Sequence, residues 1–332
     1  MSIKPTVALV LPESISTQMF TAASLARLSE HATVVGPLLP DAPGFTESVK
    51  PARVVLGGWG TPHFGAELLK LFPHLEFFAY SAGSVKGVVS DALYGRGVTV
   101  TTSASGNATP VAEFTVAMMQ ALLKQVFWLA PMMSAGNRAW GDRFEQVREL
   151  CDIEVGLVGA SRIGREVVRL LKAFKHLRVK LYDPFLTPQQ AEALGVQLCS
   201  LDEVCACEVV SVHAPNIPQT RHMLNARTLA RLPDHAVFIN TSRGALVDET
   251  ALIAEVKRRP IYVLLDVTDP EPPAKDSELR TLENIILTPH IAGAMKQARH
   301  EMGRIAIDEV IRFLAGQPLS DPITREMLAT QA

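Results

Sequence analysis

The chain has 332 residues, of which 48% are hydrophobic and 20% are charged. Its 32 basic and 34 acidic residues give a net charge of −2, which argues against nucleic acid or an anionic membrane as a partner. At this length roughly three quarters of the extended-chain surface is buried on folding, which is ample for two cores and argues against intrinsic disorder.

The apolar part of the amino-terminal segment, Met1–Pro12, is too short for a secretory signal peptide, and we expect a buried strand there. No apolar run approaches the ~20 residues that a membrane span needs. Because the cysteines are few and lack a usual zinc or redox spacing, we expect reduced thiols, no metal site and a cytoplasmic protein. The four are Cys151, Cys199, Cys205 and Cys207.

The first hundred residues alternate apolar runs with helical patterns, which predicts a small parallel α/β domain. Its expected strands are Val7–Leu11, Ala32–Val35, Val54–Leu56, Leu75–Ala79 and Val98–Thr101. A helix should follow, with Thr109 as its N-cap and Pro110 at its first position, and begin the crossing into a second domain.

The stretch Val155–Gly164 joins a short apolar run, a tight turn of small residues and the start of a helix. Nineteen residues after Gly164, the next apolar run ends in Asp183. This is the layout of a dinucleotide-binding βαβ unit, in which the helix N-terminus binds the pyrophosphate and the acid binds the ribose diol. Ser161 stands where glycine is usual, although its hydroxyl can donate to a phosphate. The turn alone fits an ordinary strand-to-helix connection about as well, and the flanking periodicity and Asp183 favour the nucleotide site.

Buried strands are expected at six places in this second domain, which fits a doubly wound sheet: 153–158, 177–182, 208–213, 236–240, 261–266 and 284–288. The last helix, which ends before Gly316 and Pro318, has no place in that sheet and should return to the first domain. The predicted fold class is therefore α/β, with two doubly wound parallel-sheet domains and a substrate cleft between them. A Rossmann nucleotide-binding domain, residues 109–294, is inserted in a flavodoxin-like substrate domain, residues 1–108 and 295–332.

Three side chains follow the ends of consecutive predicted strands: Arg243, Glu271 and His290. Parallel strands end at one edge of a sheet, so these side chains should gather there. Arginine grips a carboxylate in two places, histidine exchanges a proton near neutrality, and a carboxylate fixes the imidazole. Each residue alone is more often structural or solvated. Together, downstream of a nucleotide turn, they describe reversible reduction of a 2-keto acid.

With these residues, nearly the whole chain resembles the D-isomer-specific 2-hydroxyacid dehydrogenases. The matching motifs are Val111–Glu113, Gly159–Gly164, Tyr182–Pro184, Val212–Pro215, Thr220–His222, Asn240–Asp248, Leu265–Val267, Glu271–Pro272 and Pro289–Gly293. The resemblance implies that Arg243 binds the substrate carboxylate and carbonyl, that His290 is the general acid/base and that Glu271 is its partner. It also implies that the backbone around Ala82, Gly83 and Ser84 holds the substrate carboxylate.

The nucleotide turn and the resemblance together indicate which residues bind the cofactor. They are Gly159, Ser161, Arg162, Ile163, Gly164, Asp183, His213, Ala214, Pro215, Thr220, Thr241, Ser242, Asp266 and Gly293. NAD is favoured over NADP, because Asp183 would repel a 2′-phosphate and Pro184–Leu186 supply no cation for one.

The chain departs from the family's pattern at several positions. Ser161 replaces a glycine, the segment Ile261–Leu265 lacks one, and the interval from Arg243 to Asp266 is one residue short. The segment Gly57–Gly60 is also unusual, and we hypothesise that its Trp59 forms a wall of the substrate pocket. A packed core tryptophan is the equal alternative.

The resulting hypothesis is hydride transfer between a nicotinamide and C2 of a D-2-hydroxy or 2-keto acid, with glyoxylate and hydroxypyruvate as first candidates. One alternative is an NAD-sensing scaffold of the corepressor type. Another is phosphoglycerate dehydrogenase-like activity, against which stand the lack of an arginine cluster in the first-domain loops and the expected lack of a regulatory domain. The family usually forms dimers through its nucleotide domain, and the apolar stretch Val126–Trp140 could make that contact in a homodimer or be an intradomain helix and loop.

Overall fold

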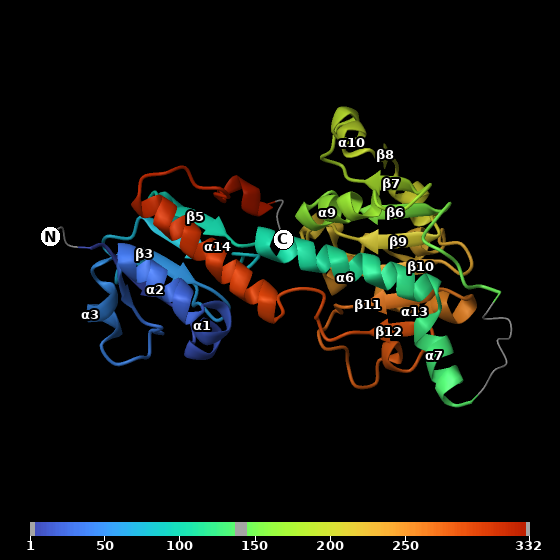
Figure 1. Ribbon diagram of the computed structural model, residues 1–332, viewed down its shortest axis with the longest axis horizontal. Coiled ribbons are helices and arrows are strands. Elements are labelled where there is room, and N and C mark those ends of the chain that lie inside the picture. Colours follow the sequence, from blue (N-terminus) through green and yellow to red (C-terminus); the bar gives the residue numbers. More distant parts are fainter. Residues whose placement is uncertain (1–3, 137–144, 330–332) are drawn as a thin grey trace. The chain divides into compact units, whose positions relative to one another are not determined.

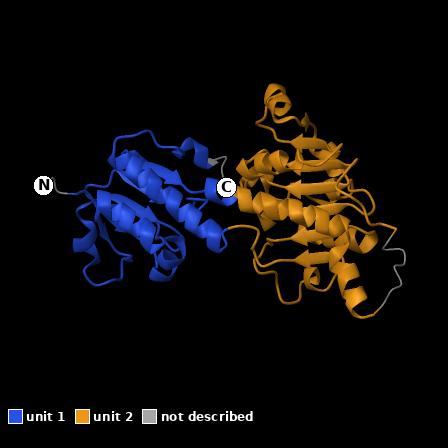
Figure 2. Ribbon diagram, viewed as in Figure 1, with its two compact units in different colours: residues 1–107, 294–332 blue, residues 108–293 orange. Residues whose placement is uncertain are grey.

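The structure, a computed structural model, describes residues 4–136 and 145–329 (Figure 1). The chain divides into two compact units (Figure 2). Unit 1 consists of residues 1–107 and 294–332, and unit 2 of residues 108–293. Ala294 donates its backbone N–H to the side-chain oxygen of Asn107 at 2.6 Å, so the two ends of the chain that enter and leave unit 1 are tied together.

Unit 1 is built on a five-stranded parallel sheet in the order β2-β1-β3-β4-β5. Its strands are β1 (Thr6–Leu9), β2 (Thr33–Val35), β3 (Ala52–Gly57), β4 (Phe77–Tyr80) and β5 (Thr99–Thr102). All five predicted strands are present, and their order is that of flavodoxin-like folds, as predicted.

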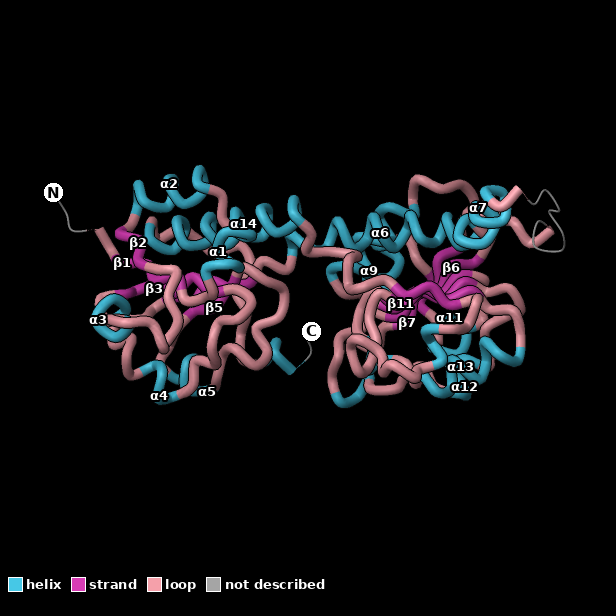
Figure 3. The backbone as a smooth tube through the Cα atoms, turned by 90° about the horizontal axis from the view of Figure 1, so that it is seen from below, coloured by secondary structure: helices cyan, strands magenta, loops and turns pink. Residues whose placement is uncertain are grey.

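Helices cover both faces of this sheet, with α2 and α14 on one side and α4 and α5 on the other (Figure 3). The helices are α1 (Glu13–Met19), α2 (Ala22–His31), α3 (Phe45–Val49), α4 (Ala66–Leu69), α5 (Asp91–Gly95), α14 (Lys296–Leu314) and the short η4 (Glu326–Ala329). A Cβ on Gly303 of α14 would lie 2.1 Å from the carbonyl oxygen of Met19, so only glycine allows α14 to cross α1 this closely. Phe313 stacks on Phe77, with 4.7 Å between ring centroids. The predicted return of the last helix to the first domain is confirmed.

Unit 2 is built on a seven-stranded parallel sheet in the order β12-β11-β10-β9-β6-β7-β8. Its strands are β6 (Glu154–Val158), β7 (Arg178–Tyr182), β8 (Gln197–Leu198), β9 (Val209–Val212), β10 (Val237–Asn240), β11 (Tyr262–Leu265) and β12 (Ile285–Leu287). The six predicted strands are confirmed, and their order is that of a doubly wound Rossmann sheet. Strand β8 was missed because two residues are too short to form a detectable apolar run.

Each face of this second sheet has its own hydrophobic core. The helices α6 (Ser105–Leu123) and α9 (Arg162–Leu171) cover one face, while α11 (Leu201–Cys205), α12 (Ala226–Leu229) and α13 (Glu249–Arg258) cover the other (Figure 3). The remaining elements of the unit are α7 (Val126–Ser134), α10 (Pro188–Leu194), η1 (Pro218–Thr220), η2 (Gly244–Leu246) and η3 (Glu278–Arg280).

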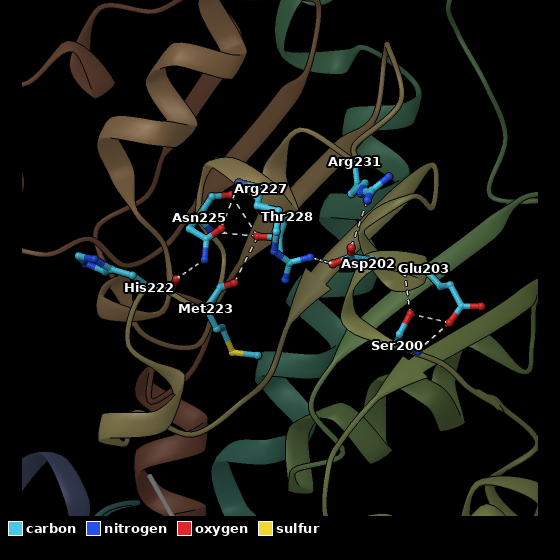
Figure 4. A network of polar contacts seen from close by, with 9 residues as sticks. All are labelled: Ser200, Asp202, Glu203, His222, Met223, Asn225, Arg227, Thr228 and Arg231. Atoms are coloured by element: carbon cyan, nitrogen blue, oxygen red, sulfur yellow. Dashed lines mark hydrogen bonds and ion pairs between the residues drawn. The ribbon is translucent and has the colours of Figure 1, made fainter.

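Two of the covering helices are very short, and polar side chains fix where they begin (Figure 4). Ser200 and Glu203 form a capping box at α11, in which each side chain bonds to the backbone N–H of the other. Asn225 caps α12 through the N–H of Arg227 at 3.1 Å. Asp202 of α11 pairs with Arg227, which links the two helices. Such caps compensate for the poor intrinsic stability of a one-turn helix.

The prediction that Thr109 caps a helix with Pro110 at its first position is wrong. Helix α6 begins at Ser105, five residues before the predicted first position, and Pro110 lies inside it. The proline removes one N–H but does not end the helix, because the preceding turn is held by tertiary packing. A Cβ on Gly106 would lie 3.0 Å from the side chain of Ile305 and 3.3 Å from the backbone nitrogen of Met302, both in α14. Contact with a second helix thus overrides the local signal.

Among the helices described, none is by itself long and apolar enough to cross a membrane; α6 and α7 pass that test only as a pair, with a 58° bend between them. All four cysteines are free thiols. Burial raises the pKa of Cys205 and of Cys207 to about 12, so both stay protonated and unreactive near neutrality.

Candidate active site

One candidate residue follows the carboxyl end of each of six strands of unit 2. In the order β6, β7, β9, β10, β11 and β12, they are Gly159, Asp183, His213, Thr241, Asp266 and His290. Because all six strands are parallel, these residues lie along a single edge of the sheet. In open parallel sheets this is the edge where ligands bind.

The turn after β6 is shaped by two glycines. Gly159 has a φ of +103°, and a Cβ there would lie 2.6 Å from the backbone nitrogen of Ala214. A Cβ on Gly164 would lie 2.2 Å from the carbonyl oxygen of Gly159. Only glycine fits either position, and the contact with Ala214 joins the loops that follow β6 and β9. These strands flank the point where the strand order reverses, where dinucleotides bind in this fold.

Ser161, which replaces the family's usual glycine, is the N-cap of α9. Its φ of −59° is open to any residue, so the backbone does not require glycine here. Its hydroxyl accepts the N–H of Gly164 at 3.3 Å and keeps its own hydrogen for a phosphate oxygen. Arg162 and Ile163 form the first turn of α9, whose amides lack acceptors within the helix. The serine is therefore compatible with a bound pyrophosphate.

Asp183 sits at the end of β7 with its carboxylate held by two backbone donors. The N–H of Ala160 donates to one oxygen at 2.7 Å, and that of Phe185 donates to the other at 2.8 Å. Each carboxylate oxygen retains a second lone pair, which a ribose hydroxyl can occupy. The position and the remaining acceptors both fit the adenosine ribose of a dinucleotide.

His213 is buried, and neither of its ring nitrogens has a hydrogen-bond partner in the part of the chain that the structure describes. Burial lowers the pKa of the imidazole to about 3, so the ring is neutral at physiological pH. Buried polar atoms are nearly always satisfied, and two orphaned ones beside the Gly159 turn fit a site that a polar ligand completes.

The lowered pKa of His213 makes a prediction for the ligand-free protein. In the unfolded chain, His213 has its ordinary pKa of 6.5, whereas in the folded chain its pKa is about 3. The free energy of unfolding therefore decreases as the pH falls from 6.5 toward 3. Between pH 7.5 and pH 5 this amounts to about 2 kcal/mol. Urea unfolding at both pH values should show the loss in the wild type and a loss smaller by that amount in His213→Leu, which has a similar volume. Equal losses in the two proteins would contradict the assignment.

The hydroxyl residues of the predicted cofactor set hold the loops of this edge together. Thr241 contacts Thr115 of α6 at 3.0 Å between hydroxyl oxygens, and Ser242 donates to the carbonyl of Ala214 at 2.7 Å. Thr220 donates to the carbonyl of Pro215 at 2.6 Å. These side chains therefore fix the backbone against which a cofactor would lie.

Arg243 is positioned by the turn that follows β10. The amide of Asn240 closes this turn by accepting the N–H of Ser242 at 3.0 Å and donating to the carbonyl of Arg243 at 2.9 Å. The guanidinium Nη1 donates to the carbonyl of Ser242 at 2.6 Å. Burial lowers the pKa of Arg243 from its ordinary value, and the nearby charge of Glu271 opposes that effect. The result is a half-buried cation beside a carboxylate.

His290 and Glu271 are in direct contact. Nδ1 of His290 lies 2.7 Å from Oε1 of Glu271, and the two side chains are 49% and 42% exposed. The backbone of His290 has a φ of +55°, which is uncommon for a residue other than glycine and typical of functional sites. Since Nδ1 faces the carboxylate, Nε2 is the ring nitrogen left for a substrate.

Asp266, one of the expected cofactor residues, has a structural role that the sequence did not reveal. It is 1% exposed, and its carboxylate accepts three hydrogen bonds from the loop that carries His290. The donors are the hydroxyl of Thr288 at 2.6 Å and the N–H groups of Ile291 at 2.8 Å and Ala292 at 2.9 Å. Asp266 thus joins the β11 and β12 loops and sets where His290 stands.

A pocket of about 410 Å³ opens beside His290 and Glu271. Its lining includes Asp266, Glu271 and His290 together with Arg280, which sequence reasoning had missed. Arg280 donates to the carbonyl of Pro273 at 2.6 Å and so shapes the loop that carries Glu271. Gly293, the last of the expected cofactor residues, is buried at the end of the β12 loop.

In unit 1, the expected substrate residues follow two neighbouring strands. Ala82 and Gly83 follow β4, and Trp59 follows β3. Gly83 is half-buried, and a Cβ on it would meet no atom within 4 Å, so its backbone borders open space. Trp59 is half-buried against the core of unit 1, with the guanidinium carbon of Arg299 5.6 Å from its ring centroid.

Comparison with known proteins gives a consistent result. Residues 116–292 match the family model described as "D-isomer specific 2-hydroxyacid dehydrogenase, NAD binding domain". The D-3-phosphoglycerate dehydrogenase of Mycobacterium tuberculosis is 32% identical over 260 residues, which cover 78% of this chain and 48% of that protein. The corresponding protein of Archaeoglobus fulgidus is 28% identical over 260 residues, which cover 78% of this chain and 49% of that one.

The chain thus spans about half the length of the curated relatives it matches. Among solved structures, a phosphoglycerate oxidoreductase from Rhizobium etli has a TM-score of 0.81 and 26% identity, with 96% of this chain and 99% of that one covered. The family model, which describes an NAD-binding domain, covers more than half of the sequence, including Gly159–Gly164 and the strand-end residues Arg243, Glu271 and His290. The chain therefore belongs to the family of D-isomer-specific 2-hydroxyacid dehydrogenases.

Proposed function

We propose that this protein is an NAD-dependent oxidoreductase that interconverts a D-2-hydroxy acid and its 2-keto acid. The observation that carries the proposal is the 2.7 Å contact between His290 and Glu271, with the half-buried cation Arg243 at the end of the neighbouring strand. This reaction needs a proton donor and a cation that binds the substrate carboxylate, both beside the nicotinamide.

Bound NADH would supply the hydride that reduces C2. In that direction, Nε2 of His290 donates a proton to the carbonyl oxygen of the substrate, while Glu271 at Nδ1 holds the ring in place. Arg243 binds the substrate carboxylate and carbonyl oxygen with the guanidinium donors that do not face Ser242. In oxidation, His290 takes the proton back.

The cofactor preference proposed is NAD over NADP. The Asp183 carboxylate, held by the N–H groups of Ala160 and Phe185, would repel a 2′-phosphate. The residues that follow it, Pro184 to Leu186, bring no cation to offset that repulsion.

There are two candidate classes of substrate. Small 2-keto acids such as glyoxylate and hydroxypyruvate need only the carboxylate clamp and a compact pocket. The names of the phosphoglycerate dehydrogenase relatives support 3-phosphoglycerate as the second candidate. We propose that unit 1 also contributes to substrate binding, with the backbone of Ala82 and Gly83 contacting the carboxylate and Trp59 bordering the side chain.

The test is to follow NADH and NADPH absorbance with glyoxylate, hydroxypyruvate, pyruvate and 3-phosphohydroxypyruvate. Turnover with NADH is the expected result and identifies the accepted class. Turnover with NADPH alone would overturn the cofactor preference. Tight NADH binding, measured by calorimetry, without turnover of any keto acid would overturn the enzyme proposal and favour an NAD-sensing scaffold.

The role of Gly83 gives a sharper prediction. Since a Cβ there meets no atom of the protein and its φ is not positive, Gly83→Ala should fold with unchanged thermal stability. A bound carboxylate that approaches the backbone would meet the added methyl group, so KM should rise about tenfold or more, the effect of roughly 1.4 kcal/mol. Steady-state kinetics and a melting curve check both halves. An unchanged KM would show that no substrate approaches here.

A homodimer formed through α7 is also proposed. No residue of this apolar helix is fully buried, and Val126 and Met133 are 45% and 59% exposed. Trp140, at the end of the stretch expected to make this contact, lies outside the described residues. Sedimentation should show a wild-type dimer and a Met133→Glu monomer, with Ser134→Glu on the same helix as the control for added charge alone. A dimer that survives Met133→Glu and Val126→Glu would place the interface elsewhere.

A further inference from the structure

The loop between β3 and α4 carries Trp59 and is tightly packed. A Cβ on Gly58 would lie 2.8 Å from the hydroxyl of Ser81, and a Cβ on Gly60, whose φ is +79°, would lie 2.7 Å from the ring of Pro12. Thr61 accepts the N–H of Gly58 at 2.8 Å and donates to the carbonyl of Val10 at 2.7 Å. Tight packing on both sides makes this loop rigid.

This rigid loop lies beside the loop that is expected to hold the substrate carboxylate. Ser81, which precedes Ala82, donates both its N–H and its hydroxyl to the carbonyl of Gly57, at 2.9 and 2.7 Å. Strands β3 and β4 are neighbours, so both loops leave the same edge of the sheet in unit 1. Gly58, the residue before Trp59, therefore lies against Ser81, the residue before Ala82.

Arg299, from the first turn of α14, lies over the indole of Trp59 at cation–π distance, with 5.6 Å from its guanidinium carbon to the ring centroid. Its Nε donates to the carbonyl of Ala294 at 2.5 Å, and its Nη1 donates to the side chain of Gln18. Nη2 has no acceptor among the residues that the structure describes, and none of these residues forms an ion pair with Arg299. The guanidinium of Arg299 is therefore held by two hydrogen bonds and has no anionic partner among the described residues.

We propose that Arg299, held over Trp59, binds a second anionic group on the side chain of the substrate, so that the preferred substrates are 2-keto or 2-hydroxy acids with a distal carboxylate or phosphate. This inference rests on the function proposed above and names its substrate class. A guanidinium in a cation–π contact keeps its remaining N–H groups for an anion, and the contact restricts where those groups point. Because two donors are already satisfied by the protein, little conformational freedom is lost when the anion binds.

The competing explanation is that Arg299 only fastens α14 to α1 through Gln18. A fastening role predicts that loss of the guanidinium lowers the melting temperature and affects every substrate alike. A binding role predicts a change in KM confined to substrates with a second anion. The two roles are therefore separable in the same variants.

The experiment compares matched substrate pairs in the wild type, Arg299→Gln and Gln18→Ala. 2-Ketovalerate against 2-ketoglutarate tests a distal carboxylate, and hydroxypyruvate against 3-phosphohydroxypyruvate tests a phosphate. Arg299→Gln should raise KM for the dianionic member of the preferred pair about 10- to 100-fold, the usual range for hydrogen bonds to a charged group. Its kcat, and the KM of the monoanionic members, should stay within about twofold of the wild type. Gln18→Ala, which keeps the guanidinium, should retain the preference.

Several results would overturn the inference. A wild type that turns over both members of each pair equally well has no second-anion site. Equal losses on all substrates in Arg299→Gln, with a lowered melting temperature, would leave only the fastening role. Turnover of monoanionic acids alone would contradict the inference while supporting the proposed function, whereas no turnover of any keto acid would reject both.

Discussion

Replacing His290 with alanine is expected to lower kcat about 10²- to 10⁴-fold, the range that a positioned general acid contributes. The ring nitrogen Nε2 is the proton donor in the proposed reaction, and without it the developing alkoxide takes its proton from water. Affinity for NADH should change little, because the expected dinucleotide contacts lie at Gly159–Gly164, Asp183 and His213. Steady-state kinetics and calorimetry with NADH measure the two quantities separately.

Glu271→Gln provides the matched control for this variant. The amide keeps a polar group at the 2.7 Å contact with Nδ1 but removes the carboxylate that orients the imidazole. Its kcat should therefore fall less than that of His290→Ala, because Nε2 remains in place to donate the proton. A His290→Ala protein with unimpaired turnover would remove the general acid from the proposal.

The position of the candidate site in unit 2 could be predicted from the sequence, because the site residues follow the ends of predicted parallel strands. Parallel strands read as continuous apolar runs, and their order places Arg243, Glu271 and His290 on neighbouring strands without any knowledge of side-chain contacts. The tight turn at Gly159 was predictable for the same reason, since its glycines are a local requirement of the backbone.

The parts that the sequence did not reveal depend on contacts between distant segments. Asp266 meets donors that follow it by 22 to 26 residues, and a single acid at a strand end carries no sign of these partners. The contact between Arg299 and Trp59 could not be predicted from the first-domain loops, because Arg299 lies on a helix 240 residues away in the sequence. The start of α6 was misplaced because Gly106 packs on α14, a contact that no local pattern contains.

Asp266→Asn is expected to lose both stability and catalysis. The carboxylate is 1% exposed and accepts three hydrogen bonds, and the amide would turn an NH₂ group toward at least one N–H or O–H donor. Removing one member of a buried, charge-assisted network costs about 3–5 kcal/mol, which chemical denaturation should detect as a lower midpoint with an unchanged m value. Since the same bonds set the position of His290, kcat should fall by about tenfold or more even under conditions where the variant is fully folded.

Thr288→Val separates positioning from folding. It removes one of the three bonds, the 2.6 Å contact from the Thr288 hydroxyl, and leaves the carboxylate and both backbone donors in place. Its stability should fall by about 0.5–2 kcal/mol and its kcat only slightly, because the backbone of Ile291 and Ala292 still fixes the loop. The graded series from wild type through Thr288→Val to Asp266→Asn should show kcat and stability falling together. A folded Asp266→Asn protein with wild-type kcat would mean that His290 reaches its substrate without this support, and that Asp266 serves the fold alone.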